Sequence, residues 1–361
     1  MRGDHPPLVS VVMAVRNGER YLAEAVDSIL GQTLDALELI AVDDGSADAT
    51  PALLERYAAA DSRVRVVRGG PRGLTASLIA GCALARGEFI ARMDADDVAF
   101  PDRLARQVAH LRTHPAVAAL GGAAIRIDAA GEPLKLLEVP ATHAAIVEQL
   151  QRASALAHSA VTMRAGALAA VGGYRAAFRH AQDYDLWLRM AERFELANLS
   201  EPVIYYRVHD AQVSTAHLLD QTICGLAAQA AAVRRRATGA DPIASDRPIT
   251  RELLVELGVS EAAIDDAISG MLARVARLLT ESGASEHAIA LLRAGVRLPR
   301  GRTIAGPLLG AAYRGQVREH YRRRRLVRSA IATVRAARAD PAGLVAALRR
   351  AAPAARPRPC T

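Results

Sequence analysis

The chain has 361 residues, of which 51% are hydrophobic and 4% aromatic, enough to bury one large core or two of ordinary size. Its net charge of +8 comes from the last 61 residues, which contain 14 arginines and only two acidic residues, Glu319 and Asp340. Three widely separated cysteines without metal-ligand spacing argue against a disulfide scaffold and fit a reducing compartment. The N-terminus lacks a signal-peptide pattern, and no apolar stretch reaches the roughly 18–20 residues of a membrane helix. We therefore expect a cytoplasmic protein, either soluble or peripheral on the inner face of the cell membrane.

The first hundred residues alternate between apolar, β-branched runs and amphipathic stretches. The run LVSVVMAV at 8–15 is continuously apolar, as expected of a strand buried on both faces, and Asn17-Gly18 ends it. The same patterns predict further strands at 37–42, 63–67 and 88–93, and helices at 19–31, 48–60 and 74–86. Strands and helices that alternate through short connections predict a parallel, right-handed α/β sheet.

Mixed elements continue to about residue 214, and helical patterns follow. The first part predicts a helix from Pro101 to about His114, then helices near 142–152 and at 182–194, strands at 117–127, 158–164 and 202–209, and a turn at 170–175. Beyond it the candidate helices are 217–238, 250–257, 260–282, 285–296 and 314–338, with a linker or long turn at 238–248. We therefore divide the chain into an α/β domain at 1–214, a helical and basic region at 215–350 and a disordered tail at 351–361.

Three carboxylates follow the strand predicted at 88–93, in the stretch IARMDADDV: Asp94, Asp96 and Asp97. A solvated turn with a helix cap would explain them, and so would a divalent cation bound by hard oxygen ligands. The other predicted strands end at Arg16-Asn17, Asp43-Asp44 and Arg72-Gly73. Parallel strands end at one edge of a sheet, where open α/β sheets bind ligands, so polar clusters confined to that edge favour a binding site.

Six stretches within residues 8–213 resemble family 2 glycosyltransferases of the GT-A fold. They are VSVVMAVRNGERYLAEAVDSILGQT, LELIAVDDGSADAT, ARGEFIARMDADDVAFPDRLARQ, HSAVTMRAGALAAVGGYR, QDYDLWLRMAE and YRVHDAQVS, in the family's order and spacing. Each is a weak signal alone, but together they are specific and span more than half of the chain. The resemblance implies a Rossmann-like, mixed and mostly parallel sheet flanked by helices, followed here by an all-helical C-terminal extension.

The family's DXD motif is matched by Asp94-Ala-Asp96. By this resemblance Asp96 is a ligand of Mn²⁺ or Mg²⁺, which neutralises a departing diphosphate as a Lewis acid, while Asp94 lies by the ribose or the hydrated metal. His209 corresponds to a histidine that such enzymes often bring to the metal or the diphosphate, although a lone histidine is usually structural. Asp97 is expected to cap the following helix or to hold Arg103.

The same resemblance assigns residues to the nucleotide-sugar donor. Asp44 matches a carboxylate that accepts the N3–H of uracil or thymine, and helix capping by Asp43 or Asp44 is the alternative for this pair. Arg72 faces either the diphosphate or solvent, and Arg207 is expected to pair with phosphate or with one of the acids.

Two departures from the family pattern affect the donor site. The donor-lining loop after the first strand comprises Ala14, Val15 and Arg16, and Arg16 stands where an aromatic residue is frequent, although a guanidinium can also stack on a base. Ile79 stands where relatives commonly have Asn. A structural role is expected for His158.

The stretch QDYDLWLR at 182–189 resembles the family's acidic motif at the start of a helix, whose Asp is the general base. The match assigns this role to Asp183, with Gln182 in place of the usual Glu, and an N-cap without chemistry is the alternative. Asp185 is expected to cap or support the helix. Trp187 belongs either to the acceptor site or to the core.

The resemblance implies an inverting, metal-dependent hexosyltransferase of bacterial type. It would move a sugar from a nucleotide-diphosphate donor, with UDP or dTDP favoured, to a glycan or lipid-linked acceptor in cell-surface polysaccharide synthesis. The alternative is a catalytically weak or inactive nucleotide-sugar-binding protein or a scaffold of a glycan-assembly complex. A dinucleotide oxidoreductase is disfavoured, because Val15-Arg16-Asn17-Gly18 stands where the Gly-x-Gly-x-x-Gly turn is needed.

The arginine-rich stretch 313–339 predicts a basic helix. Beside a lipid-linked acceptor it would suit peripheral contact with an anionic membrane, and a solvated or partner-binding face is the competing interpretation. No nucleic-acid partner is expected, because no recognised binding module accompanies the charge.

Overall fold

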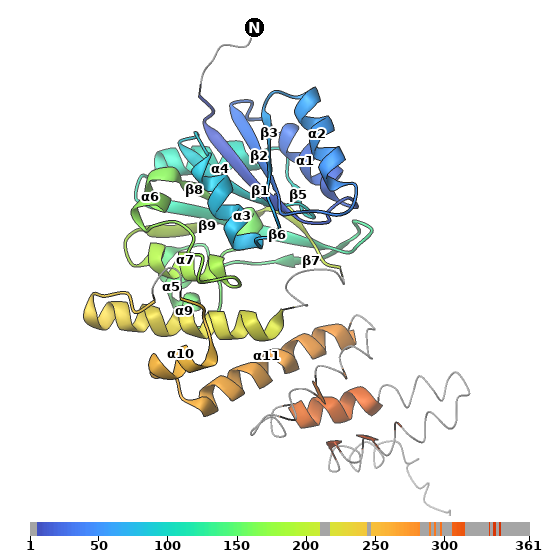
Figure 1. The fold of residues 1–361 in the computed structure, drawn as a ribbon, viewed down its shortest axis with the longest axis vertical. Helices are drawn as coiled ribbons and strands as arrows, with labels where there is room; N and C mark the ends of the chain where they lie inside the picture. The colour runs from blue at the N-terminus through green and yellow to red at the C-terminus, as the bar shows by residue number, and fades with distance from the viewer. Residues whose placement is uncertain are drawn as a thin grey trace, which may run out of the picture. The chain divides into compact units, whose positions relative to one another are not determined.

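The structure is a computed structural model, and it describes residues 6–209, 217–243, 247–281, 289, 292–293, 297, 305–314, 332, 335–336 and 339–340. The chain forms two compact units. The first comprises Met1–Ala216 with Cys224–Leu253, and the second comprises His217–Ile223 with Leu254–Thr361. The first unit contains all the strands of the described residues, and the candidate site residues predicted from the sequence lie in it (Figure 1).

Within the described residues, nine strands form one sheet in the order β3-β2-β1-β4-β8-β6-β9-β5, and β7 pairs with β6. The strands are β1 Val9–Val15, β2 Leu37–Asp43, β3 Val64–Arg68, β4 Phe89–Asp94, β5 Val98–Ala99, β6 Val117–Ile127, β7 Pro133–Leu137, β8 Thr162–Arg164 and β9 Glu195–Arg207. The helices of the first unit up to residue 216 are α1 Leu22–Leu30, α2 Thr50–Ala60, α3 Leu74–Ala83, α4 Arg103–Thr113, α5 His143–Leu150, α6 Ala165–Ala170, α7 Gln182–Ala191 and the 3₁₀ turn η1 His158–Ala160.

One half of the sheet is parallel, as the sequence predicts. β1 pairs with β2 and β4, and β2 pairs with β3, all in parallel. The register sets Val15 beside Asp43 and Ala14 beside Asp94, so the strands end together. Every residue of β1 and β2 is buried, which explains why their sequences are continuous apolar runs.

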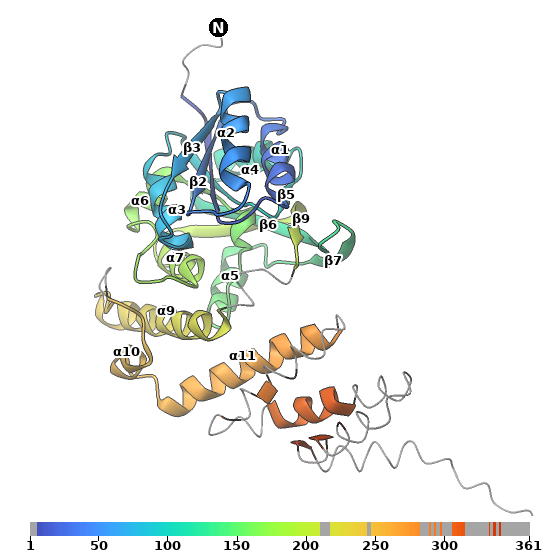
Figure 2. The same ribbon diagram turned by 45° about the vertical axis from the view of Figure 1, so that its right-hand side comes forward.

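The other half of the sheet is mixed. β8 pairs antiparallel with β4 and β6, β9 runs parallel to β6, and the short β5 pairs antiparallel with β9. This mixed, mostly parallel arrangement flanked by helices confirms the predicted GT-A class. The helices lie on both faces of the sheet (Figure 2).

Two predicted strand boundaries are wrong. Residues 158–160 were expected to open a strand, but they form the turn η1, whose Ala160 N–H donates to Ala157 O at 2.9 Å. Strand β9 begins at Glu195 rather than near 202, because β6 pairs with it from Val117 onward. Pairing with a neighbour, which local sequence does not reveal, overrides the weak strand preference of residues 195–201.

The core is built from small and aliphatic side chains on both faces of the sheet. Helices α1, α2 and α4 pack against the face that bears Val11 and Met13. Helix α3 lies on the opposite face, and a Cβ added to Gly81 would lie 2.5 Å from Val12 Cγ1 and 3.2 Å from Val42 Cγ2. Only glycine therefore permits this close approach of α3 to the strands that lead into the site.

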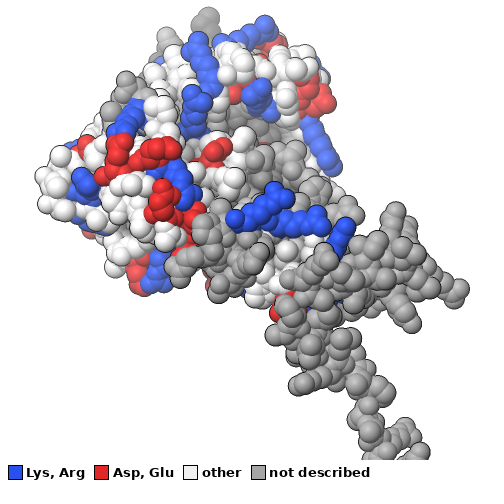
Figure 3. Space-filling view, turned by 60° about the horizontal axis from the view of Figure 1, so that its bottom comes forward, with Lys and Arg blue, Asp and Glu red and all other residues white. Residues whose placement is uncertain are grey.

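The described C-terminal segments are helical, as predicted. They are α9 Leu218–Thr238, α10 Arg251–Glu256 and α11 Glu261–Glu281, and none of the described helices is long and apolar enough to cross a membrane. On the face drawn in Figure 3, basic and acidic side chains are interspersed over the described residues. Most of 285–296, 313–339 and 351–361 lies outside the described residues, so the basic helix, the disordered tail and the membrane contact stay predictions.

We expect Gly81→Ala to lower the free energy of unfolding by about 1–3 kcal/mol, because the added methyl group overpacks the contact between α3 and β1. Chemical denaturation of the full chain measures this change. Gly166→Ala in α6 is the matched control, since an added Cβ there meets nothing within 4 Å. Equal stability of the two variants would contradict the packing argument.

Candidate active site

The loops after β1 and β2 are bonded to each other at the edge where the parallel strands end. The backbone N–H of Asn17 donates to Ser46 Oγ at 2.9 Å, and Asn17 Oδ1 accepts from the N–H of Ala47 at 2.8 Å. Asn17 has a φ of 52°, a left-handed conformation that Asn tolerates better than most residues. The predicted loop placement is therefore correct only for Arg16, which is exposed, because Ala14 and Val15 are the buried last residues of β1.

Asp44 organises the turn that leads into α3. Its Oδ1 accepts hydrogen bonds from the backbone N–H groups of Arg72 at 2.8 Å and Gly73 at 3.0 Å, and from Ser77 Oγ at 3.1 Å. The structure thus brings Asp44 to the backbone of Arg72, whereas the Arg72 side chain is exposed. Ser77 is a member of this cluster that sequence reasoning missed.

The expectation that Asp43 or Asp44 caps α2 is wrong. The N-cap position of α2 is Ala49, which makes no side-chain cap hydrogen bond. Asp43 Oδ1 instead accepts from the N–H of Ser46 at 3.1 Å, within the loop that follows β2. Asp43 therefore stabilises its own turn, and α2 begins at Thr50, seven residues after Asp43 and six after Asp44, beyond the reach of either carboxylate.

The carboxylates at the end of β4 converge. One oxygen each of Asp94, Asp96 and Asp97 lies within 4.8 Å of the others. His209 Nε2 lies 3.0 Å from Asp96 Oδ2, although the two residues are 113 positions apart. Carboxylate oxygens with one imidazole nitrogen make a donor set that fits Mn²⁺ or Mg²⁺, so the residues present suit the predicted cation.

Asp97 does not have its expected partners. It is buried, its Oδ1 accepts from the backbone N–H of Arg207 at 2.8 Å, and Ser159 Oγ donates to its Oδ2. Burial, followed by repulsion from Asp94 and Asp96, raises the pKa of Asp97 well above its usual value. The expectation of a helix cap or a bond to Arg103 is wrong. The carboxylate of Asp97 instead accepts hydrogen bonds from Ser159 and from Arg207 of β9, and so connects the segment after β4 to β9.

Arg207 fixes the position of Asp96. Its Nε donates to the Asp96 carbonyl at 2.8 Å and its Nη2 pairs with Glu24 at 2.5 Å, so the acid that it meets is not one of the DXD pair. Its guanidinium also lies 4.5 Å from the centre of the Tyr21 ring, which in turn lies 5.1 Å from the His209 ring. Arg207 is buried and helps to hold Asp96 in place through its carbonyl, and His209 through the ring of Tyr21.

Arg92 is a buried cation that sequence reasoning missed. It precedes Asp94 by two residues, so both side chains leave the same face of β4, and its Nη1 forms an ion pair with Asp94 Oδ1. Burial raises the pKa of Asp94, nearby Arg92 opposes this shift, and Asp96 adds to it. An arginine inside an apolar strand, directly before the acidic motif, was the signal available in the sequence.

Asp183 lies in the first turn of α7. The N-cap position is Ala181, with a left-handed φ of 53°, so the expected alternative of Asp183 as N-cap is wrong. Burial raises the pKa of Asp183 above its ordinary value, the N–H of Tyr184 and the charge of Arg92 oppose this, and Asp94 raises it further. Asp183 and Asp94 thus influence each other electrostatically, as two carboxylates of one site do.

Three ring side chains lie near the charged residues of the site, with His158 in contact with both Tyr174 and Trp187. His158 Nε2 lies 2.7 Å from Tyr174 OH, and its ring meets Trp187 edge-on at 6.2 Å. Burial, with the charge of Arg92, lowers the pKa of His158 well below its usual value, so its imidazole is neutral. Trp187 is completely buried and belongs to the core rather than to an acceptor surface.

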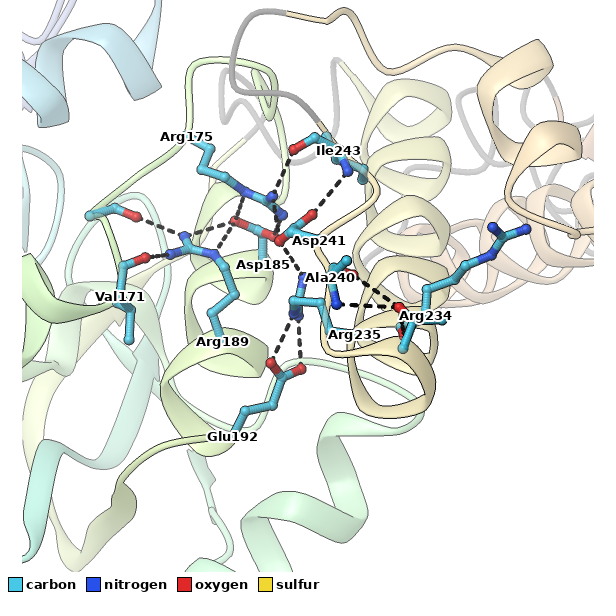
Figure 4. A network of polar contacts seen from close by, with 12 residues as sticks. Val171, Arg175, Asp185, Arg189, Glu192, Arg234, Arg235, Ala240, Asp241 and Ile243 are labelled. Atoms are coloured by element: carbon cyan, nitrogen blue, oxygen red, sulfur yellow. Dashed lines mark hydrogen bonds and ion pairs between the residues drawn. The ribbon is translucent and has the colours of Figure 1, made fainter.

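A network of buried ion pairs anchors α7, as Figure 4 shows. Asp185 is fully buried, and Arg175 Nε and Arg189 Nε each donate to its Oδ2 at 3.0 Å. Arg175 continues to Asp241 at 2.9 Å, which also accepts from Arg235 at 3.0 Å. Asp185 therefore supports the helix, as expected, through side-chain ion pairs that reach the segment after α9.

The fold and the acidic site define a glycosyltransferase of the GT-A type. The sequence model of the family "Glycosyl transferase family 2" matches residues 10–171. The chain is 36% identical over 209 residues to EpsE of Bacillus subtilis (strain 168), covering 56% of this chain and 73% of that protein. It is 32% identical over 208 residues to WbnJ of Escherichia coli, an O-antigen biosynthesis glycosyltransferase, covering 56% and 80%. The chain belongs to glycosyl transferase family 2.

Solved structures agree on the fold. The crystal structure of S. aureus TarS 1–349 superposes with a TM-score of 0.51 at 16% identity, covering 91% of this chain and 90% of that chain. The same protein in complex with UDP-GlcNAc gives a TM-score of 0.51 at 17% identity and the same coverage. At this level of identity the likeness establishes the fold.

We expect Asp185→Asn to lower the free energy of unfolding by about 3–5 kcal/mol, because it leaves two buried guanidinium groups without their shared counter-charge. Urea denaturation measures the change. The control is Glu148→Gln, which breaks an exposed ion pair with Arg152 and should change stability by less than about 0.5 kcal/mol. Similar losses in both variants would contradict the role of the network.

Proposed function

We propose that the protein is an inverting glycosyltransferase that moves a sugar from a UDP- or dTDP-linked donor to a glycan or lipid-linked acceptor in cell-surface polysaccharide synthesis. The observation that carries the proposal is the convergence of Asp94, Asp96 and Asp97 at the end of β4, with His209 Nε2 3.0 Å from Asp96 Oδ2 and with Asp183 within electrostatic reach of Asp94. WbnJ, the O-antigen biosynthesis glycosyltransferase to which the chain is similar, supports the acceptor class. TarS, whose fold is similar, has been solved with UDP and with UDP-GlcNAc.

The base-binding end of the donor site is assigned to the loops after β1 and β2. Ala14, Val15 and Arg16 line it, and Arg16 is exposed and free of the core, so its guanidinium is available to stack on a base. A carboxylate has about four acceptor positions, and among the described residues Asp44 Oδ2 accepts from Gly73 N–H alone, at 3.0 Å, so it still has capacity. That capacity suits the N3–H of uracil or thymine. Arg72 is placed by Asp44 and faces the diphosphate.

The diphosphate end is assigned to the DXD motif. Asp96 and His209 would hold Mn²⁺ or Mg²⁺, and Asp94 would lie by the ribose or the hydrated ion. Such a cation supplies Lewis-acid stabilisation of the leaving diphosphate. Arg207 keeps Asp96 in place through the backbone carbonyl, so the ligand carboxylate is positioned without being neutralised.

Asp183 is assigned as the general base. As the acceptor oxygen forms its bond to the anomeric carbon, the bond from that carbon to the diphosphate oxygen breaks, and the acceptor proton moves to the Asp183 carboxylate. Attack from the face opposite the leaving group inverts the anomeric centre, and the transition state resembles an oxocarbenium ion. The raised pKa of Asp183 makes it a stronger proton acceptor than an exposed Asp.

We expect Asp183→Asn to reduce turnover by about 10²–10⁴-fold while UDP affinity stays unchanged, because the amide cannot accept the proton. Donor hydrolysis with Mn²⁺ and binding calorimetry with UDP measure the two quantities.

In the wild type, kcat/KM should fall as pH decreases through the pKa of Asp183, since only the deprotonated carboxylate acts as base. Burial raises that pKa, so the fall should begin at higher pH than for an ordinary Asp near 3.9. Saturable binding without turnover in wild type and variant alike would support a non-catalytic binding protein instead.

Removal of the metal ligand gives a separate test. UDP at about 100 times its Kd should add about 2.7 kcal/mol of stability in the presence of MnCl₂, seen as a rise in melting temperature. Asp96→Asn or EDTA should abolish that rise, since the diphosphate would lose its bridging cation. Asp102→Asn, an exposed acid before α4, is the control and should retain the rise. A UDP-dependent rise that needs neither Mn²⁺ nor Asp96 would overturn the metal assignment.

A further inference from the structure

Arg92 has polar atoms that no described residue satisfies. Its side chain is 2% exposed, and its Nε and Nη1 are buried without a hydrogen-bond acceptor, apart from the ion pair of Nη1 with Asp94. The other large buried arginines differ. Arg103 donates to Arg92 O at 2.8 Å and Arg207 to Asp96 O at 2.8 Å. An unpaired buried donor is unfavourable by about 1–3 kcal/mol, so a bound group that accepted hydrogen bonds from Arg92 would remove that cost.

The location of Arg92 indicates which part of the donor it meets. It lies on the face of β4 that carries Asp94 and forms an ion pair with that carboxylate, and its charge also opposes the rise in the pKa of Asp183. Its other electrostatic neighbours include the neutral His158 and Tyr174, the buried carboxyl of Asp97 and the buried cation Arg103. Arg92 therefore contacts the predicted donor carboxylate directly and lies within electrostatic range of the predicted base.

The space between these two carboxylates is where the transferred sugar has to lie. The nucleobase is assigned to Asp44 at the end of β2, and the diphosphate to Asp96 and His209. The anomeric carbon must lie between the diphosphate and Asp183 for the base to act, so the sugar ring spans from Asp94 toward Asp183. Of the charged side chains described here, Arg92 is the cation whose charge acts on both of these carboxylates.

We propose that Arg92 is a specificity-determining residue that donates hydrogen bonds to hydroxyl or carbonyl oxygens of the donor's sugar ring. The inference rests on the proposed function and adds a recognition element that the DXD motif does not supply. A guanidinium is suited to this, because its five N–H donors form a planar fork. The class of sugar is a neutral hexose, since Asp94, Asp97 and Asp183 already surround Arg92 and disfavour a further carboxylate.

A plain counter-ion role for Arg92 makes a different prediction. If it only balanced the charge of Asp94, its loss would disturb UDP and UDP-sugars equally, and lysine would replace it fully. A contact to the sugar ring instead affects only ligands that carry a sugar. The quantity that separates the two roles is the ratio of the Kd of UDP to that of the UDP-sugar.

The experiment is calorimetric titration, with MnCl₂, of UDP, UDP-glucose, UDP-galactose, UDP-N-acetylglucosamine and UDP-glucuronic acid. The proteins are wild type, Arg92→Gln, Arg92→Lys and the control Arg112→Gln, which changes an exposed arginine in the last turn of α4. We expect both Arg92 variants to keep UDP affinity within about twofold and to lose about tenfold or more for the neutral UDP-sugar that wild type binds most tightly. Retained UDP binding also demonstrates that the variants are folded, and Arg92→Lys keeps the charge in case Arg92→Gln does not fold.

The outcomes separate this inference from the proposed function. Equal changes for UDP and UDP-sugar, or full recovery of sugar binding by Arg92→Lys, would overturn the sugar contact while the glycosyltransferase assignment stands. Preference of the wild type for UDP-glucuronic acid would overturn the neutral class. If the wild type bound UDP but gained nothing from any sugar, Arg92 would have no such role. If it bound none of these ligands, the proposed donor class itself would fail.

Discussion

The site depends on one buried hydrogen bond, between the Asp97 carboxylate and the backbone N–H of Arg207. It ties the end of β4, which carries the DXD motif, to the end of β9, which carries His209. Further contacts reinforce this link between segments more than a hundred residues apart, because Arg207 Nε donates to the Asp96 carbonyl at 2.8 Å and β5 pairs antiparallel with β9. A buried carboxylate is unfavourable unless it is hydrogen-bonded, and here Ser159 and the β9 backbone supply the bonds. The same bond therefore makes the burial of Asp97 tolerable and brings Asp96 to His209.

The charged groups around the site fall into two kinds. Arg207, Arg175 and Arg189 have their guanidinium groups bonded on several sides and act as rigid supports. Among the described residues Arg92 has one ionic partner, Asp94, and its Nε and Nη1 have no hydrogen-bond acceptor. These N–H groups are therefore available to bind a ligand. The ion pairs of Asp185 with Arg175 and Arg189 anchor the first turn of α7, so the helix that presents Asp183 is fixed before any substrate arrives.

Two departures from the family pattern, Gln182 and Arg16, have a physical explanation in this fold. Gln182 is buried at the first position of α7, where a Glu would bring one more negative charge close to Asp183 and Asp94. An amide there avoids that repulsion, and the burial of Asp183 alone already raises its pKa. Arg16 is exposed in the loop after β1, so it can move to a ligand without disturbing the core.

Local sequence determined the parallel half of the sheet and the acids at its edge. Continuous apolar runs can only be strands buried on both faces, and parallel strands connected by helices must end together, so Asp44, Asp94 and Asp96 had to share one edge. The motif order also determined the family and the assignment of Asp183. Only the tertiary structure decided which acids are supports and which are free, because Asp97 is bonded by Ser159 and Arg207 from distant segments, and because the burial of Asp185 and Arg92 results from packing across the fold. Whether a buried charge is satisfied is a property of those long-range contacts, and no periodicity in the sequence records it.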